Sequence, residues 1–203
     1  MKFFFNLKLI HLSILFIRYN PYYAHLICRI CEYQPRCKFT LQLTFWDYFK
    51  QFETMNERKV ANLAKLLSHL LRAGPINLNV LKVIEMDLDE DMHNSILLFL
   101  TILFTHLFDN YNNSEEVSNL FRKGVLKECH HQSLDDGKTS SDNCDDDNDN
   151  NDNDKGEEGE ILRGNLSLFL IQYIKFSPKN VTKSNFHKNY KAATKACDMD
   201  GFD

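Results

Sequence analysis

Apolar residues recur at helical spacing along most of the chain, and the clearest run lies between residues 56 and 73. Basic residues Arg58, Lys59, Lys65 and Arg72 fall on or beside the opposite face of an apolar stripe formed by Val60, Leu63, Ala64, Leu67, Leu70 and Leu71. Thr54 and Glu57 have capping-box spacing, and Gly74-Pro75 predicts the end of the helix. A second stripe, starting at Leu78, predicts an antiparallel helix after this short connection.

Other segments carry similar stripes and predict further helices. The segment 21–34 opens with a proline, and its stripe is Tyr22, Leu26, Ile30 and Tyr33; the stripe of 39–52 is Leu41, Phe45, Trp46, Phe49 and Phe52. The segment 92–110 is apolar nearly all round, which predicts a central buried helix in which His106 is a satisfied core or edge histidine. A short helix starts at Ser114, and 161–176 carries the stripe Leu162, Leu166, Phe169, Leu170, Tyr173 and Ile174. These patterns predict an all-α fold of antiparallel hairpins without a sheet.

The first 18 residues form an apolar segment that resembles a signal peptide at first sight. Asn6, Lys8 and His11 interrupt its apolar run, and no cleavage site of small residues follows. We therefore expect a helix with the stripe Leu7, Ile10, Ile14 and Ile17. The secretory alternative stays open, and three Asn-x-Ser/Thr sequences would be compatible with it.

The charge of the chain is distributed unevenly. The net charge is −4, yet residues 130–160 alone carry twelve acidic and two basic side chains, so the remainder has a net charge of +6. Residues 127–160 contain almost no apolar side chains, which predicts an acidic, disordered insertion. Residues 177–203 form a basic tail in which Phe186, Tyr190 and Ala193 have helical spacing.

The cysteines offer one candidate for metal or redox chemistry. Cys28 and Cys31 form a Cys-x-x-Cys pair, but no second ligand pair has matching spacing. Buried free cysteine behaves as a small hydrophobe, so we favour reduced, structural cysteines, with Cys31 facing the core. We also find no phosphate-binding loop or nucleophile motif, and the sequence therefore predicts no metal site, no cofactor and no enzymatic activity.

Residues 56–85 resemble the MI domain, a module of helical repeats; their sequence is NERKVANLAKLLSHLLRAGPINLNVLKVIE. Residues 19–49 are similar to the preceding helix pair of the same module; their sequence is YNPYYAHLICRICEYQPRCKFTLQLTFWDYF. Two short motifs in this run point to the nucleolar relatives of translation initiation factor 4-gamma: Asn20-Pro21-Tyr22-Tyr23-Ala24 and Phe45-Trp46-Asp47. The likeness covers roughly residues 19–108 and resumes at 161–176. The first 18 residues do not match, which an incomplete gene model would explain.

The resemblance implies an MI-type domain over residues 19–176, built as a HEAT-like stack, with 127–160 inserted into it. It also implies a non-enzymatic scaffold in nucleolar small-subunit ribosome biogenesis and pre-rRNA processing. The implied partners are a DEAD-box RNA helicase of the initiation-factor-4A type and pre-ribosomal RNA or its particle, with no membrane. A splicing relative of the same module is the alternative within the family.

Two sets of charged residues are candidates for partner binding. The acidic turn after the second stripe would face a basic helicase surface; its residues are Glu85, Asp87, Asp89, Glu90 and Asp91. The tail would contact RNA phosphates through Lys179, Lys183, Lys188, Lys191 and Lys195. Both sets are inferred from charge and not from a family motif.

Overall fold

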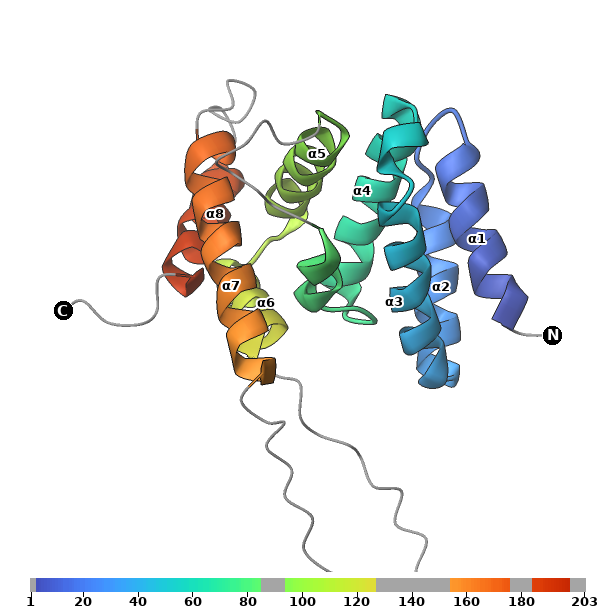
Figure 1. Ribbon diagram of the computed structural model, residues 1–203, viewed down its shortest axis with the longest axis horizontal. Helices are drawn as coiled ribbons and strands as arrows, with labels where there is room; N and C mark the ends of the chain where they lie inside the picture. The colour runs from blue at the N-terminus through green and yellow to red at the C-terminus, as the bar shows by residue number, and fades with distance from the viewer. Residues whose placement is uncertain (1–2, 85–93, 127–153, 176–183, 198–203) are drawn as a thin grey trace, which may run out of the picture.

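The computed structural model describes residues 3–84, 94–126, 154–175 and 184–197. All regular structure in these ranges is helical, which confirms the predicted all-α fold (Figure 1). The α-helices are α1 (Phe3–Leu15), α2 (Pro21–Tyr33), α3 (Arg36–Phe49), α4 (Glu57–Ala73), α5 (Asn94–Asn110), α6 (Ser114–Leu126), α7 (Asp154–Phe169) and α8 (Ser184–Cys197). Two short 3₁₀ segments, η1 (Phe52–Thr54) and η2 (Leu78–Val83), and one π-helical segment, η3 (Leu170–Ile174), complete them.

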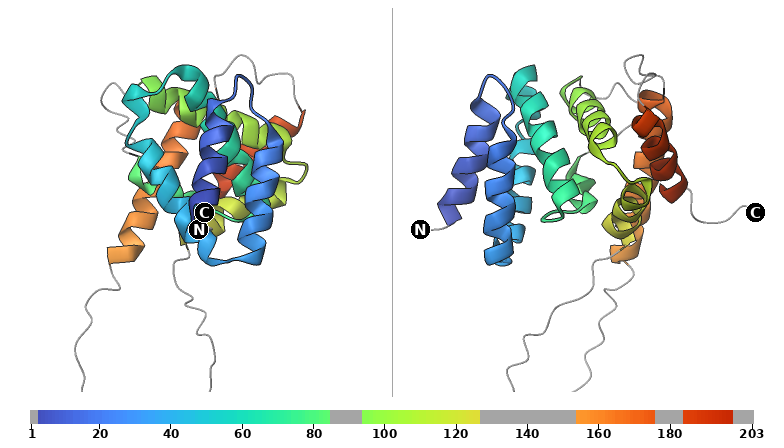
Figure 2. Two further views of the ribbon diagram at one scale, coloured as in Figure 1. Left: turned by 90° about the vertical axis from the view of Figure 1, so that its right-hand side faces the viewer. Right: turned by 180° about the vertical axis from the view of Figure 1, so that it is seen from behind.

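Helices α1, α2 and α3 form the N-terminal layer and pack on one another, with α1 and α2 also against α4 (Figure 2). The Asn20 side chain caps α2 by accepting a hydrogen bond from the Tyr22 backbone N–H at 3.0 Å, and Pro21 occupies the first turn. In α1, Ile10 and Ile14 are buried as expected, whereas Ile17 lies beyond the end of the helix and is 79% exposed.

The predicted stripe of α2 is only partly confirmed. Leu26 and Ile30 are half-buried against the core, but Tyr22 and Tyr33 are 61% and 80% exposed, and the fully buried residues are Ala24, Ile27 and Cys31. Small side chains at 24 and 31 allow α1, α3 and α4 to approach the α2 backbone closely, which bulky tyrosines would prevent. Apolar residues surround most of α2, so periodicity alone could not choose between the two phases.

The predicted stripe of α3 is confirmed. Leu41, Phe45, Phe49 and Phe52 are buried, and Trp46 is half-buried. The rings of Phe49 and Phe52 lie 5.4 Å and 5.0 Å from the ring of Phe99 on α5. These aromatic contacts join the N-terminal layer to the centre of the molecule.

The prediction for helix α4 agrees best with the structure, except for the residue that caps its N-terminus. Its N-cap is Asn56, whose side chain accepts a hydrogen bond from the Lys59 backbone N–H at 3.0 Å, so the predicted capping box with Thr54 is wrong. Thr54 instead donates its hydroxyl hydrogen bond to the Gln51 carbonyl. At the other end the helix stops at Gly74, as predicted, and this glycine adopts the left-handed conformation with φ 85°.

Burial extends around α4 beyond the predicted stripe. Leu66, Ser68 and His69 are buried as well, because α1 and α2 cover one side of the helix and α5 covers the other. Buried Asn62 donates hydrogen bonds to the carbonyls of Ile14 and Phe16, which end α1. Helix α4 is therefore the centre of the N-terminal half.

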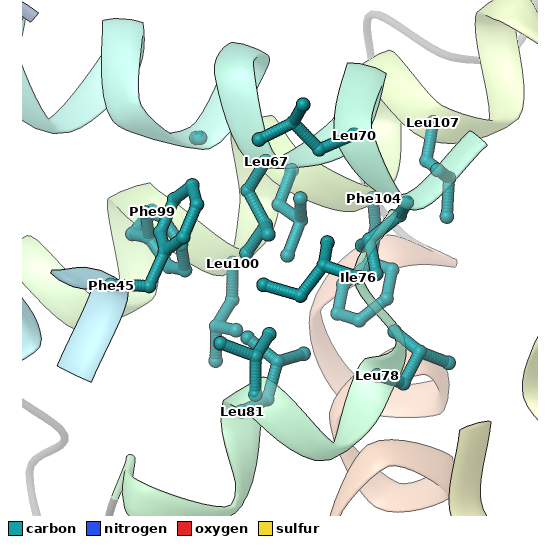
Figure 3. Packing of buried hydrophobic residues seen from close by; sticks show 14 of the residues in the cluster. Phe45, Leu67, Leu70, Ile76, Leu78, Leu81, Phe99, Leu100, Phe104 and Leu107 are labelled. Carbon is teal, nitrogen blue, oxygen red and sulfur yellow. The ribbon is translucent and has the colours of Figure 1, made fainter. Parts of the chain in front are cut away.

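The predicted antiparallel helix after Gly74 is replaced by η2, a 3₁₀ segment of six residues. Leu78, Val80 and Leu81 are still buried, so the apolar pattern marks the core correctly but not the type of helix (Figure 3). Helix α5 then packs parallel to α4: Ser68 meets His106, and Arg72 donates to the carbonyl of Asn110, a constant offset of 38 residues. The segment η2 provides the return between them.

Helix α5 is central and buried, as predicted. Phe99, Leu100, Leu103, Phe104, Leu107 and Phe108 are all buried, and Figure 3 shows several of them packed with Leu67 and Leu70 of α4 and with residues of η2. The other side of α5 faces α8 and η3. Phe104 contacts Phe121 of α6 and Phe169 of α7, with ring centroids 6.0 Å apart in both pairs.

Helices α6, α7 and α8 form the C-terminal layer, and the predicted stripe of 161–176 is buried except for half-buried Tyr173. Helix α7 starts at Asp154, so the last seven residues of the predicted disordered insertion, 154–160, are helical. Residues 127–153 lie outside the described residues. The regular α-helix gives way at Leu170 to the π-helical segment.

The C-terminal residues are not a separate tail, because α8 packs against α5 and α6. Phe186, Ala193 and Ala196 are buried, and buried Asn189 donates two hydrogen bonds of 2.8 Å to the carbonyls of Phe108 and Tyr111. The amphipathic helix was predicted, but its part in the core was not.

Candidate partner-binding surface

The acidic turn lies between η2 and α5 in the chain, and its five predicted binding residues, Glu85, Asp87, Asp89, Glu90 and Asp91, fall outside the described residues. The structure does fix the elements from which the turn departs and to which it returns. Ile84 is buried at the end of η2, and α5 begins at Asn94.

The segment η2 is held firmly at the surface of the core. The Asn77 side chain accepts a hydrogen bond from the Asn79 backbone N–H at 3.2 Å, and the Trp46 indole N–H donates to the Val80 carbonyl at 3.0 Å. The Lys82 ammonium lies 5.9 Å from the centroid of the Trp46 ring. These contacts therefore hold η2, the segment that directly precedes the acidic turn in the chain, in a fixed position.

A pocket of about 300 Å³ opens between the end of η2 and α7. It is lined by Lys82, Val83, Ile84, Ile161, Leu162 and Asn165, and two of its apolar side chains, Val83 and Ile161, are 39% and 63% exposed. We call it the η2–α7 groove. Sequence reasoning missed it because its two walls come from segments about eighty residues apart in the chain.

The predicted lysines are only partly described. Lys179 and Lys183 fall outside the described residues, whereas Lys188, Lys191 and Lys195 are exposed on α8. Their spacing of three and four residues places them along one side of the helix, while Phe186, Asn189 and Ala193 face the core. Helix α8, which carries this row, lies at the opposite end of the molecule from α1 (Figure 1).

A polar cluster lies where α2, α4 and α5 meet. The rings of His25 and His69 are 4.6 Å apart, and His106 Nδ1 is 3.0 Å from the Ser68 hydroxyl, which confirms His106 as a satisfied histidine. Burial, with smaller contributions from Arg72, His25 and His106, lowers the pKa of His69 to about 4. The Ser68–His106 pair has the distance of a nucleophile and a base, but Ser68 is only 2% exposed and a substrate cannot reach it.

The cysteine pair of α2 has the properties of packed thiols. Cys31 is buried, as predicted, and its burial raises the thiol pKa to about 11; burial likewise raises the pKa of Cys28. Both thiols are therefore protonated at neutral pH, whereas reactive cysteines need the thiolate. The described residues contain no group of three or more potential metal ligands and no helix long and apolar enough to cross a membrane.

Comparison with known proteins identifies relatives of the chain over about half of its length. It is 39% identical to Nucleolar MIF4G domain-containing protein 1 of Mus musculus over 93 residues, or 45% of this chain. It is 36% identical to the protein of the same name from Homo sapiens over 113 residues, or 54% of this chain. The matched regions span only 11% and 13% of those proteins. Suppressor of glycerol defect protein 1 of Schizosaccharomyces pombe is 26% identical over 52% of this chain and 16% of its own length.

No family model matches the chain, and no solved structure does. The names of the animal relatives agree with the predicted nucleolar localisation. They also agree with the resemblance found in residues 19–108, which the helical fold supports. The chain is thus helical and similar, over about half of its length, to the nucleolar MIF4G domain-containing proteins.

Proposed function

We propose that this chain is a non-catalytic helical scaffold of nucleolar small-subunit ribosome biogenesis, where pre-rRNA is processed. In this proposal it docks a DEAD-box RNA helicase of the initiation-factor-4A type. The observation that carries the docking proposal is the η2–α7 groove, whose wall at Ile84 directly precedes the acidic turn in the chain. An apolar anchor of the partner would enter the groove, and basic residues beside it would face the acidic turn.

The chemistry of the two parts supports this division of labour. Val83 and Ile161 offer exposed apolar surface that a partner side chain can cover, and buried anchors dominate the energy of most interfaces. Five acidic residues within 85–91 supply charge that raises the association rate with a basic partner and penalises acidic ones. The groove would thus contribute affinity, and the turn would contribute selectivity.

The test is retention of the full chain on immobilised helicase. Ile161→Glu places a charge in the groove at a position that is 63% exposed, so the fold should tolerate it. We expect affinity to fall by about tenfold or more, the scale of a lost anchor. Ile17→Glu is the matched control, because Ile17 is 79% exposed at the other end of the molecule.

A charge-reversed turn, with Asp87, Asp89 and Glu90 replaced by lysine, separates the two contributions. We expect slower association and a weaker dependence on salt than in the wild-type chain. Unchanged retention of both the groove variant and the turn variant would refute helicase docking at this surface.

Pre-ribosomal RNA is the second proposed partner, and the exposed row Lys188, Lys191 and Lys195 favours it. Three cations along one helix side match the spaced phosphates of a nucleic acid backbone. Replacing all three by glutamine should weaken RNA binding and its salt dependence; an unaltered salt dependence would exclude this row as the phosphate contact.

A further inference from the structure

The outer side of α3 carries aromatic, aliphatic and basic side chains that lie wholly or partly outside the core. Phe39 is 64% exposed, Leu43 is 36% exposed, and Trp46 is half-buried beside them. Residues 36, 39, 43, 46 and 50 repeat at intervals of three and four, so they lie along one side of the helix. We call this side the α3 strip; it consists of Arg36, Phe39, Leu43, Trp46 and Lys50.

The neighbours of α3 leave this strip open. On one flank α1 approaches, where His11 Nδ1 is 3.1 Å from the Tyr48 hydroxyl. On the other flank η2 approaches, where Trp46 binds the Val80 carbonyl and Lys82 lies over its ring. Figure 1 shows α3 and η2 side by side on the face turned toward the viewer.

The charge around the strip is positive. Residues 1–84 contain twelve basic and four acidic side chains, a net charge of +8 in a chain whose total is −4. Arg36 and Lys50 are exposed and form no ion pair with a carboxylate in the described part of the chain. One acidic residue, Asp47, lies on the same side. An anionic partner therefore fits this surface better than a basic one.

We propose that the α3 strip, together with Lys82, binds single-stranded RNA. Exposed aromatic rings accept stacked bases, and cations spaced beside them hold the phosphate backbone, which is the common design of surfaces for single-stranded nucleic acid. Phe39 offers the most exposed ring and would stack a base, while Arg36 and Lys50 contact phosphates on either side. This site is separate from the lysine row of α8 and does not depend on helicase docking.

The only tryptophan of the chain is in the strip, which gives the test a direct reporter. The full chain is titrated with a 12-nucleotide oligouridine, and Trp46 fluorescence is followed at several salt concentrations. We expect quenching that saturates. Phe39→Ala should weaken binding by about 5- to 150-fold, the range for one stacked base. Lys50→Gln should reduce the slope of log K against log salt concentration by about 0.7, the value for one phosphate of a single strand.

Two controls make the outcome decisive. In the α8 variant, with Lys188, Lys191 and Lys195 replaced by glutamine, saturating oligouridine should still quench Trp46 to the wild-type limit. Adding Phe39→Ala to this variant should weaken binding by the same factor as in the wild-type chain, because the two surfaces are separate. Inorganic polyphosphate should bind more weakly than oligouridine and leave the fluorescence unchanged, because it has no bases to stack. Circular dichroism checks that each variant remains folded.

Each contrary result would overturn the proposal. Wild-type affinity in the Phe39→Ala, Lys50→Gln double variant would exclude the strip, and so would loss of the Trp46 quenching at saturating oligouridine in the α8 variant. Equal affinity for polyphosphate and oligouridine would exclude base stacking. Reduced helicase retention by the double variant, with RNA binding unaltered, would assign the strip to a protein partner.

Discussion

Asn189 provides a direct test of whether the C-terminal helix is part of the domain. Its side chain is 2% exposed, and its amide donates to the carbonyls of Phe108 and Tyr111 at the end of α5. Carbonyls at a helix end have no partner within the helix, so an outside donor must satisfy them. Asn189→Ala removes both hydrogen bonds and leaves two acceptors in a buried place.

The expected loss follows from these two acceptors. A buried acceptor left without its donor costs about 1–3 kcal/mol. We expect the free energy of unfolding to fall by about 2–4 kcal/mol, in the lower half of the summed range because a helix end can shift to admit water. This is a large share of the roughly 5–15 kcal/mol that stabilises a typical domain.

Urea unfolding measures the loss with two probes, circular dichroism for all helices and Trp46 fluorescence for α3. Lys191→Ala is the control on the exposed side of the same helix and should change the free energy of unfolding by less than about 0.5 kcal/mol. If Asn189→Ala is as mild as Lys191→Ala, α8 does not contribute to the core as described. If only the circular dichroism transition shifts, α8 unfolds separately from α3.

Three further predictions concern the N-terminal half, α7 and pH. Leu67→Ala, at a fully buried position of α4, should lower the free energy of unfolding in urea by about 2–5 kcal/mol. Arg58→Ala, at an exposed position of the same helix, should lower it by less than about 0.5 kcal/mol. Equal losses would contradict the phase of the helix. In thermal unfolding, Gly74→Ala should destabilise the protein by about 1–2 kcal/mol, because φ is +85° at this position. Gly164→Ala within α7 should stabilise it by about 0.5–1 kcal/mol, because open space surrounds the added methyl group. The reverse signs would refute this account. The pKa of His69 is 6.5 in the unfolded chain and about 4 in the folded protein, so the unfolded state binds more protons between these values. Stability should therefore fall as the pH is lowered from about 6.5 to about 4. In urea unfolding across this range, His69→Gln should lose less stability than the wild-type chain, and equal losses in the two proteins would exclude the effect.

The sequence predicted those elements in which one face is apolar and the other is charged. Helix α4 is the clearest example, because only one phase separates Leu67 from Arg58. Helix α2 has apolar residues on several sides, and the size of Ala24 and Cys31, rather than periodicity, decides which side is buried. Residues 78–83 have too few positions to distinguish a 3₁₀ segment from an α-helix.

The candidate surface was predicted less completely than the fold. Charge composition identifies the acidic turn, but the apolar groove requires Val83 and Ile161 to meet, and no local pattern indicates a contact across an insertion. The role of Asn189 was missed for a similar reason, since a polar residue within a basic segment usually indicates solvent exposure. A buried asparagine is explained only by its distant partners.

The parallel course of α4 and α5 has an electrostatic consequence. Both helices end at the same edge of the molecule, so the partial negative charges of two helix C-termini, about half an elementary charge each, lie close together. Arg72 and Asn189 supply hydrogen-bond donors at this edge, where Arg72 binds the Asn110 carbonyl at 3.1 Å. An antiparallel pair would place opposite partial charges together. The cation at position 72 therefore offsets a repulsion between two helix ends that the parallel arrangement creates, in addition to satisfying a carbonyl.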